Sequence, residues 1–202
     1  MAEYVYHRDG PTWANAYLWP ALGNIIASRH WPDKRAFDLG CGNGATSVML
    51  HSAGFEIAGV DTSASGIAIA RQSLPQGNFA VASAYDDLAA PFGQFPLVVS
   101  LEVIEHCMEP RRFVRTFSNL IAPGGIGVLS TPYHGYLKNL LLSFSGKMDN
   151  HFTALWDGGH IKFFSIKSLT ALLHEEAVGN IKFLRVGRIP PLAKSMIAIL
   201  SN

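Results

Sequence analysis

A run of closely spaced glycines between a predicted strand and a predicted helix most constrains how this chain of 202 residues can fold. Residues 35–39 (RAFDL) have the composition of a short strand, residues 40–44 (GCGNG) follow directly, and residues 44–53 have the pattern of a helix. Gly40 permits a tight turn there, and Gly42 allows the backbone to come close to a ligand. Because the first amides of the helix would point at the same place, this unit predicts a ligand site at the end of a strand.

The rest of the chain alternates between predicted strands and predicted helices. Further strands are expected at residues 55–60, 79–81, 97–101, 126–130, 181–186 and 195–200, and further helices at residues 12–29, 63–73, 109–121 and 165–177. This alternation is typical of an α/β fold in which helices cover both faces of a parallel sheet. No helix is predicted between the last two strands, so we expect them to pair as an antiparallel hairpin at one edge.

Capping residues, glycines and prolines predict where several helices begin and end. Thr62 or Ser63 is expected to cap the helix that follows the second strand. Residues 123–125 (PGG) are expected to end the helix that precedes them. Pro20 lies inside the helix predicted at residues 12–29, which allows that segment to divide into two short helices.

Composition indicates one globular domain, residues 1–202, and excludes several classes of protein. Hydrophobic residues make up 49% of the chain, which is too many for a disordered protein. The net charge is +1, from 16 basic and 15 acidic residues, so the chain has no general field to attract nucleic acid. Two cysteines, Cys41 and Cys107, make no disulfide framework, and neither a signal-peptide pattern nor an apolar stretch of membrane-spanning length is present. We therefore expect a cytoplasmic protein without a transmembrane segment.

Two carboxylates beside the glycine-rich turn suit a nucleoside cofactor. Asp61 ends the second strand, where its carboxylate can accept both hydroxyls of a ribose. The spacing Gly40-x-Gly42-x-x-Ala45 also satisfies the dinucleotide fingerprint of nicotinamide-dependent oxidoreductases, which is the rival interpretation. Asp38 counts against that rival, because dinucleotide enzymes usually have an apolar residue two positions before the first glycine.

Four motifs in order carry a resemblance to a known family. Residues 38–44 (DLGCGNG), 59–63 (GVDTS), 102–106 (EVIEH) and 122–125 (APGG) resemble the motifs of class I methyltransferases that use S-adenosylmethionine (SAM). The nearest resemblance is to the ubiquinone-biosynthesis type of O-methyltransferase, over roughly residues 35–200. It implies a Rossmann-like sheet of seven strands, mostly parallel with an antiparallel last strand. It also implies transfer of the SAM methyl group to a small-molecule acceptor, an aromatic or lipid-like hydroxyl. A SAM-binding protein without catalytic activity is the third interpretation.

The resemblance also implies which residues hold the cofactor. Asp38, Gly40 and Gly42 are expected at the methionine end of SAM, Asp61 at the ribose and Thr62 near the adenine. The whole expected cofactor-binding set is Asp38, Gly40, Cys41, Gly42, Asp61, Thr62, Ser83, Ala84 and Glu102. The family often has an acidic residue after the third strand, and this chain has Ser83 at that position, which departs from the pattern.

Histidines are the candidate catalytic residues, because an acceptor hydroxyl must lose a proton when it is methylated. The candidate bases are His106, His134, His151 and His160, of which we expect His106 and His160 to act in catalysis. Each of them has the alternative of being an ordinary surface or packed histidine.

A second hypothesis is that two of these histidines, together with two glutamates, bind a metal ion. Glu102, Glu105 and His106 are spaced so that one helical turn would place them on a single face. With His160 they could bind Mg²⁺, Mn²⁺ or Zn²⁺, and the pattern resembles the metal-dependent ubiquinone and small-RNA terminal 2′-O-methyltransferases. The chain has no basic surplus, which favours a small acceptor over RNA. The alternative is that Glu105 and His106 only line the pocket.

Two segments lie outside the alternating pattern. Residues 1–34 are expected to form an N-terminal helical cap, and residues 132–164 an insert over the acceptor site. Within the insert, residues 136–144 predict an amphipathic helix with a broad apolar side. We favour a helix packed on the sheet; the alternatives are a lid over an apolar acceptor and a patch for transient contact with a membrane.

Overall fold

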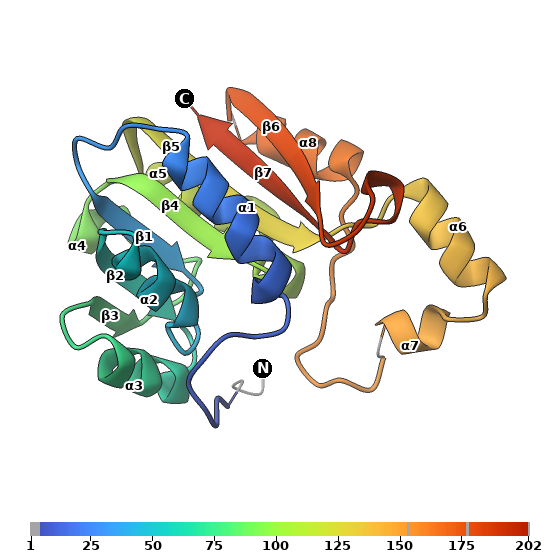
Figure 1. Cartoon of the computed structure of the whole chain (residues 1–202), viewed down its shortest axis with the longest axis horizontal. Coiled ribbons are helices and arrows are strands. Elements are labelled where there is room, and N and C mark those ends of the chain that lie inside the picture. Colours follow the sequence, from blue (N-terminus) through green and yellow to red (C-terminus); the bar gives the residue numbers. More distant parts are fainter. Residues whose placement is uncertain (1–4, 153, 177, 202) are drawn as a thin grey trace.

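In a computed structural model, the protein consists of a seven-stranded sheet with helices on both faces (Figure 1). The structure describes residues 5–152, 154–176 and 178–201. The strands are β1 (Arg35–Leu39), β2 (Glu56–Asp61), β3 (Asn78–Val81), β4 (Phe95–Leu101), β5 (Ile121–Pro132), β6 (Asn180–Val186) and β7 (Ser195–Ser201). Their order in the sheet is β3-β2-β1-β4-β5-β7-β6.

The directions of the strands confirm the predicted fold class. Strands β1 to β5 pair in parallel, whereas β7 is antiparallel to both of its neighbours, β5 and β6. The last two strands therefore form the expected antiparallel pair, with β6 at the edge. Parallel strands all end at the same side of a sheet, so the loops after β1, β2, β4 and β5 meet there.

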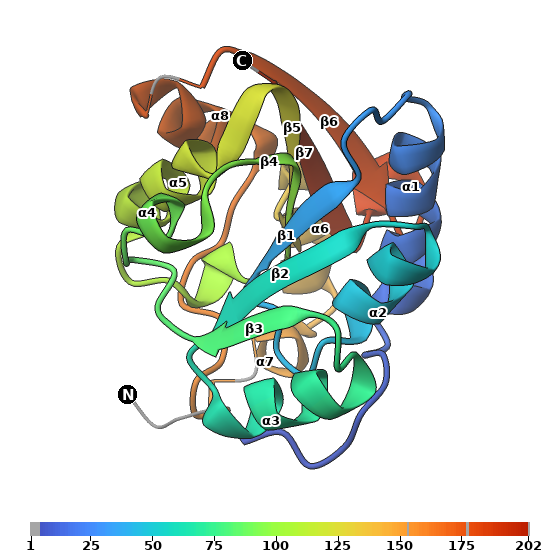
Figure 2. The ribbon, with the colours of Figure 1, turned by 90° about the vertical axis from the view of Figure 1, so that its left-hand side faces the viewer.

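Two layers of helices cover the sheet (Figure 2). The layers consist of α1 (Asn15–Ala27), α2 (Ala45–Ser52) and α3 (Ala64–Ser73) on one face, and α4 (Ala89–Phe92), α5 (Pro110–Asn119) and α8 (Ile166–Glu175) on the other. The insert contributes α6 (Tyr136–Phe144) and α7 (Met148–Phe152). Each face of the sheet packs its own apolar cluster, which explains why the central strands are almost wholly apolar.

Several element boundaries differ from the sequence prediction. The helix α1 continues through Pro20, because Leu18 and Leu22 on either side of it are fully buried and hold one continuous face. The strand β5 begins at Ile121, so residues 123–125 lie inside a strand with a shifted register against β4 rather than in a turn. The predicted cap of α3 is confirmed: of Thr62 and Ser63 it is Ser63, whose hydroxyl accepts a hydrogen bond from the Gly66 amide at 3.1 Å.

Replacing two glycines by alanine is expected to change stability in opposite directions. A Cβ at Gly127 in β5 would overlap the ring of Phe117, which is fully buried, so Gly127→Ala should lower the free energy of unfolding by about 1–3 kcal/mol. A Cβ at Gly23 in α1 meets no atom within 4 Å, so Gly23→Ala should raise it by about 0.5–1 kcal/mol. Urea denaturation measures both; destabilisation by the Gly23 variant would contradict the packing described here.

Candidate functional site

The glycine-rich loop after β1 is packed against two other segments. A Cβ at Gly40 would lie 2.6 Å from Cγ2 of Val103, so this glycine lets the loop after β4 approach. A Cβ at Gly42 would overlap the hydroxyl of Tyr6, from the N-terminal segment. Both glycines have positive φ values, +79° and +53°, which other residues rarely adopt. The approach of a ligand to Gly42 stays a prediction; in the structure the Tyr6 side chain lies beside this glycine.

Asp61 and Asp38 lie on either side of this loop, as the sequence predicts. The Asp61 carboxylate accepts hydrogen bonds from the amides of Gly42 at 2.9 Å and Ser63 at 2.8 Å. Asp38 is buried in β1 and accepts a bond from the Ser47 hydroxyl at 2.7 Å. Burial raises the pKa of Asp61, and it raises the pKa of Asp38 to about 7. Each carboxylate keeps lone pairs free for a ligand.

The loops after β2 and β3 lie side by side, because Asp61 pairs with Val81. They carry the remaining residues expected near the adenine: Thr62, which is exposed, and Ser83 and Ala84, which are half-buried. The Ser83 amide donates to the Asp86 carboxylate at 2.8 Å. Asp86, which the sequence analysis did not single out, thus supplies a carboxylate beside the position where the family often has an acid.

Glu102 does not share a helical turn with Glu105 and His106, so that expectation is wrong. It follows β4 with a φ of +56°, and the turn of three residues begins only at Ile104. The Glu102 carboxylate is half-enclosed between β5 and β7, where it accepts bonds from Ser130 at 2.8 Å and Ser195 at 3.0 Å. Burial raises the pKa of Glu102 to about 7.

Glu105 is fully buried, and its carboxylate is not satisfied by the protein. Neither carboxylate oxygen has a hydrogen-bond partner among the residues that the structure describes. Its backbone carbonyl accepts bonds from Ile161 and Lys162 at 2.9 and 3.0 Å, which joins the insert to the loop after β4. Burial, followed by the charge of Glu102, raises the pKa of Glu105 well above its usual range.

His106 and His160 converge on Glu105. One ligand atom from each of the three side chains lies within 4.8 Å of the other two. Nδ1 of His106 is 2.9 Å from the Gly158 carbonyl, which can only accept, so Nδ1 carries the hydrogen and, in the neutral form of the ring, Nε2 has the lone pair. Burial lowers the pKa of His160 to about 4, so this ring is neutral at pH 7. The structure thus brings together three of the four residues predicted as metal ligands; Glu102 lies outside the group.

The other two candidate bases, His134 and His151, lie in an aromatic cluster. Their ring centroids are 5.4 Å apart, and His134 stacks on Phe152 at 5.7 Å and meets Phe163 edge-on at 5.1 Å. Burial lowers the pKa of His134 to about 4. The phenylalanines were not anticipated, because no periodic pattern connects α7 with the segment before α8.

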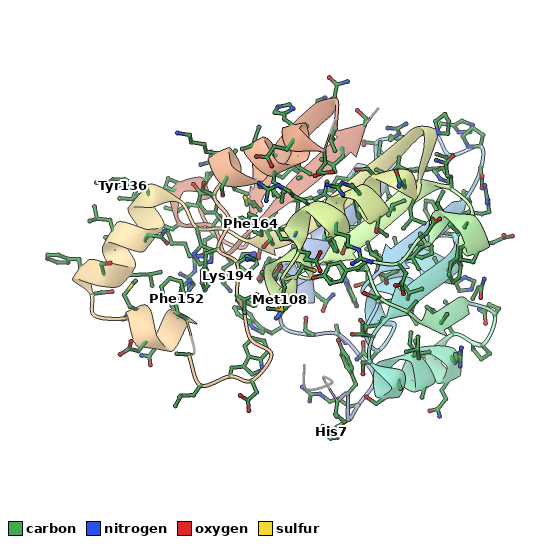
Figure 3. All side chains as sticks on the ribbon, turned by 180° about the vertical axis from the view of Figure 1, so that it is seen from behind. His7, Met108, Tyr136, Phe152, Phe164 and Lys194 are labelled. Atoms are coloured by element: carbon green, nitrogen blue, oxygen red, sulfur yellow. The ribbon has the colours of Figure 1, made fainter. Side chains whose placement is uncertain are left out.

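The insert helix α6 does not pack on the sheet, so the interpretation that we favoured is wrong. None of its nine residues, all of them described, is buried, and Tyr136 and Phe144 are 83% and 90% exposed. Figures 1 and 3 show α6 and α7 projecting from the sheet. Lys138 ties α6 to the sheet by donating to the carbonyl oxygens of Tyr133 at 2.7 Å and Lys194 at 3.3 Å. None of the described helices is long and apolar enough to cross a membrane.

Comparisons with known sequences find methyltransferases. A family model described as a methyltransferase domain matches residues 14–177. A ubiquinone biosynthesis O-methyltransferase of Caulobacter sp. (strain K31) is 37% identical over 116 residues, 55% of this chain and 46% of the relative. One from Burkholderia thailandensis is 33% identical over 132 residues, 62% of this chain and 55% of the relative. The chain thus spans about half the length of these curated relatives.

Comparisons with solved structures find the same fold. The magnesium protoporphyrin IX methyltransferase of Synechocystis PCC 6803, solved with bound SAH (S-adenosylhomocysteine), has a TM-score of 0.70 at 16% identity, covering 98% of this chain and 91% of its own. A SAM-dependent methyltransferase from Mesorhizobium loti has a TM-score of 0.69 at 18% identity, covering 91% and 97%.

Glu105 is expected to lower the stability of the ligand-free protein. A carboxyl group whose pKa is raised by folding binds more protons in the folded state, so stability falls as pH rises above its unfolded value. Glu105→Leu should therefore raise the free energy of unfolding by about 1–3 kcal/mol at pH 8, and by less at pH 5. The exposed Glu109→Leu is the control and should change it by less than about 0.5 kcal/mol. Equal effects of the two variants at both pH values would contradict an unsatisfied Glu105.

Proposed function

This chain belongs to the methyltransferase-domain family, and we propose that it transfers the methyl group of SAM to a hydroxyl of a small acceptor. The observation that carries the proposal is the gathering of buried carboxyl groups at the end of the sheet. Asp38, Asp61, Glu102 and Glu105 all lie there with raised pKa values. SAM carries a sulfonium and an ammonium group. Positive charges of this kind would stabilise the ionised form of these carboxyl groups.

SAM is the methyl donor, and the residues at the end of β1 and β2 fit it. Asp61 has both oxygens fixed by backbone amides, and it keeps lone pairs for ribose hydroxyls. Asp38, also expected at the cofactor, is held in one orientation by Ser47. The sulfonium group already makes the methyl carbon reactive, so this chain's task is to align the two substrates and exclude water.

Removal of the acceptor proton falls to the group of Glu105, His106 and His160. The hydrogen on Nδ1 of His106 is held by a backbone carbonyl, so the free lone pair on Nε2 can take a proton from a hydroxyl. His160 is neutral at pH 7, because burial lowers its pKa to about 4, so its ring is a weak base that can still accept a hydrogen bond. His160 would help to orient the acceptor hydroxyl, and His106 would receive its proton.

The same three residues fit a divalent cation. The observation in favour is the Glu105 carboxylate, which is buried without a hydrogen-bond partner among the described residues, beside two imidazoles that each retain a lone pair. Glu105, His106 and His160 would hold the ion, and Glu102 would stay with Ser130 and Ser195. When bound, such an ion supplies Lewis acidity, which lowers the pKa of a nearby hydroxyl.

The insert supports an aromatic or lipid-like acceptor. Residues 158–162 contact Glu105 and His106 directly, and Trp156 meets the ring of His106 at 5.7 Å. The exposed apolar side chains of α6 would suit a lipid-like molecule, including one reached by transient contact with a membrane. The net charge of +1 disfavours a nucleic acid acceptor. The names of the curated relatives favour O-methylation.

Calorimetry tests the cofactor. SAM and its demethylated product should bind, and NADH should not. Asp61→Ala should weaken SAM binding by about 2–3 kcal/mol, because ribose hydroxyls would lose a charged partner. The exposed Glu56→Ala, in the same strand, is the control and should bind SAM as the unaltered protein does. Binding of NADH without binding of SAM would make the chain an oxidoreductase candidate.

Chelation tests the cation. Mn²⁺ titrated into the metal-free protein should bind at one site, and Glu105→Gln and His160→Ala should each lose that binding while Glu109→Gln keeps it. Methyl transfer from radiolabelled SAM to a panel of phenols and long-chain alcohols should stop with EDTA and return with Mn²⁺. Activity that EDTA leaves unchanged would exclude the cation and leave His106 as the base; His106→Ala should then abolish transfer. SAM binding without transfer to any acceptor would favour a non-catalytic protein.

A further inference from the structure

The N-terminal segment before α1 runs across the loops that carry the cofactor site. The side-chain amide of Asn43, in the glycine-rich loop, donates to the backbone carbonyls of Arg8 at 3.1 Å and Gly10 at 2.9 Å. The Tyr6 amide donates to the Ser65 hydroxyl, at the start of α3, at 3.0 Å. These bonds attach residues 5–14 both to the glycine-rich loop after β1 and to the first turn of α3.

Two glycines make room for the ring of Tyr6. A Cβ at Gly42 would overlap the Tyr6 hydroxyl, and a Cβ at Gly66 would lie 2.9 Å from Cδ2 of the same ring. Gly66 is buried in the first turn of α3, where alanine would be the better helix former. Tyr6 therefore lies between the glycine-rich loop and α3, with its hydroxyl at the loop.

The Tyr6 hydroxyl lies in the same corner as Asp61. The hydroxyl lies where a Cβ of Gly42 would stand, and the N–H of Gly42 donates to the Asp61 carboxylate at 2.9 Å. Asp38 enters the same loop from β1. A phenol here adds a hydrogen-bond donor and acceptor to a corner otherwise formed by carboxylates and backbone.

We propose that Tyr6 is a cofactor-binding residue, and that residues 5–14 form a strap that must lift to let SAM enter and its product leave. The hydroxyl of Tyr6 bonds the cofactor at Gly42, and its ring closes the site between the loop and α3.

Most residues of the strap are exposed to solvent, which suits such movement. Two surface hollows lie beside it. One is lined by residues 7–9 together with Ile69, Gln72 and Ser73 of α3, and the other by residues 9–11 together with Asn43, Ala45 and Val48. Figure 3 shows His7 at the surface beside α3. None of residues 5–14 is buried, so local opening of the strap should cost less than global unfolding.

Binding of SAM and SAH to Tyr6 variants tests the contact. Tyr6→Phe should weaken both about fivefold by calorimetry, because one hydrogen bond is lost, and Tyr6→Ala should weaken them more than tenfold and speed dissociation. His7→Ala, an exposed change on the same segment, is the matched control and should bind as the unaltered protein does. Thermal unfolding of the ligand-free variants establishes that each is folded. Unchanged binding by Tyr6→Phe would overturn the proposal, as would tighter binding by Tyr6→Ala, which would make Tyr6 an obstruction.

Limited proteolysis tests the strap without any methyl acceptor. Trypsin cleavage after Arg8, followed by mass spectrometry, should be slowed by saturating SAM in the unaltered protein and much less in Tyr6→Ala. Equal cleavage with and without bound SAM would overturn the strap. Neither experiment depends on methyl transfer, so both remain decisive if the proposed acceptor chemistry fails.

Discussion

Burial of carboxyl groups at one end of the sheet is the constraint on which the rest of the site depends. Asp38, Asp61, Glu102 and Glu105 enter this region from three strand ends, and burial raises the pKa of each. The half-buried Lys138, whose charge lowers the pKa of Glu102, donates to two backbone carbonyls, and its own pKa is lowered to about 8, mainly by burial. The protein alone therefore leaves negative charge poorly compensated, and a cationic ligand resolves that imbalance.

The sequence predicts the sheet well because its signals are local. Each strand is a short apolar run next to a turn or a capped helix, and the glycine-rich loop marks the end of β1, which lies beside the central strand β4. The boundaries that it misses are set by contacts distant in sequence. Pro20 stays inside α1 because the sheet buries Leu18 and Leu22, and β5 begins early because it pairs with Phe95 of β4.

The site is predicted less completely, since its side chains are oriented by tertiary contacts. The spacing of Glu105 and His106 places them together, and the contact of His160 with Glu105 follows from the loop that returns to the end of β4. The same spacing predicts the wrong position for Glu102. Its backbone adopts a left-handed conformation, and its carboxylate accepts hydrogen bonds from Ser130 and Ser195. Tyr6 carries no sequence signal, because its role depends on two glycines more than 30 positions away.

The position of β7 has a consequence for the order in which the molecule folds. This strand, the last one described, lies between β5 and β6, and its Ser195 holds the carboxylate of Glu102, 93 positions earlier. Contacts so distant in sequence form late, because a long stretch of chain must first be ordered. Until the β6–β7 hairpin docks, β5 presents a bare edge of backbone groups, the kind of surface on which partly folded chains associate. A nascent chain released or cleaved before Ser195 would thus retain the glycine-rich loop. It would lack the hydrogen bond from Ser195 to Glu102, and the unpaired edge of β5 would be prone to aggregation.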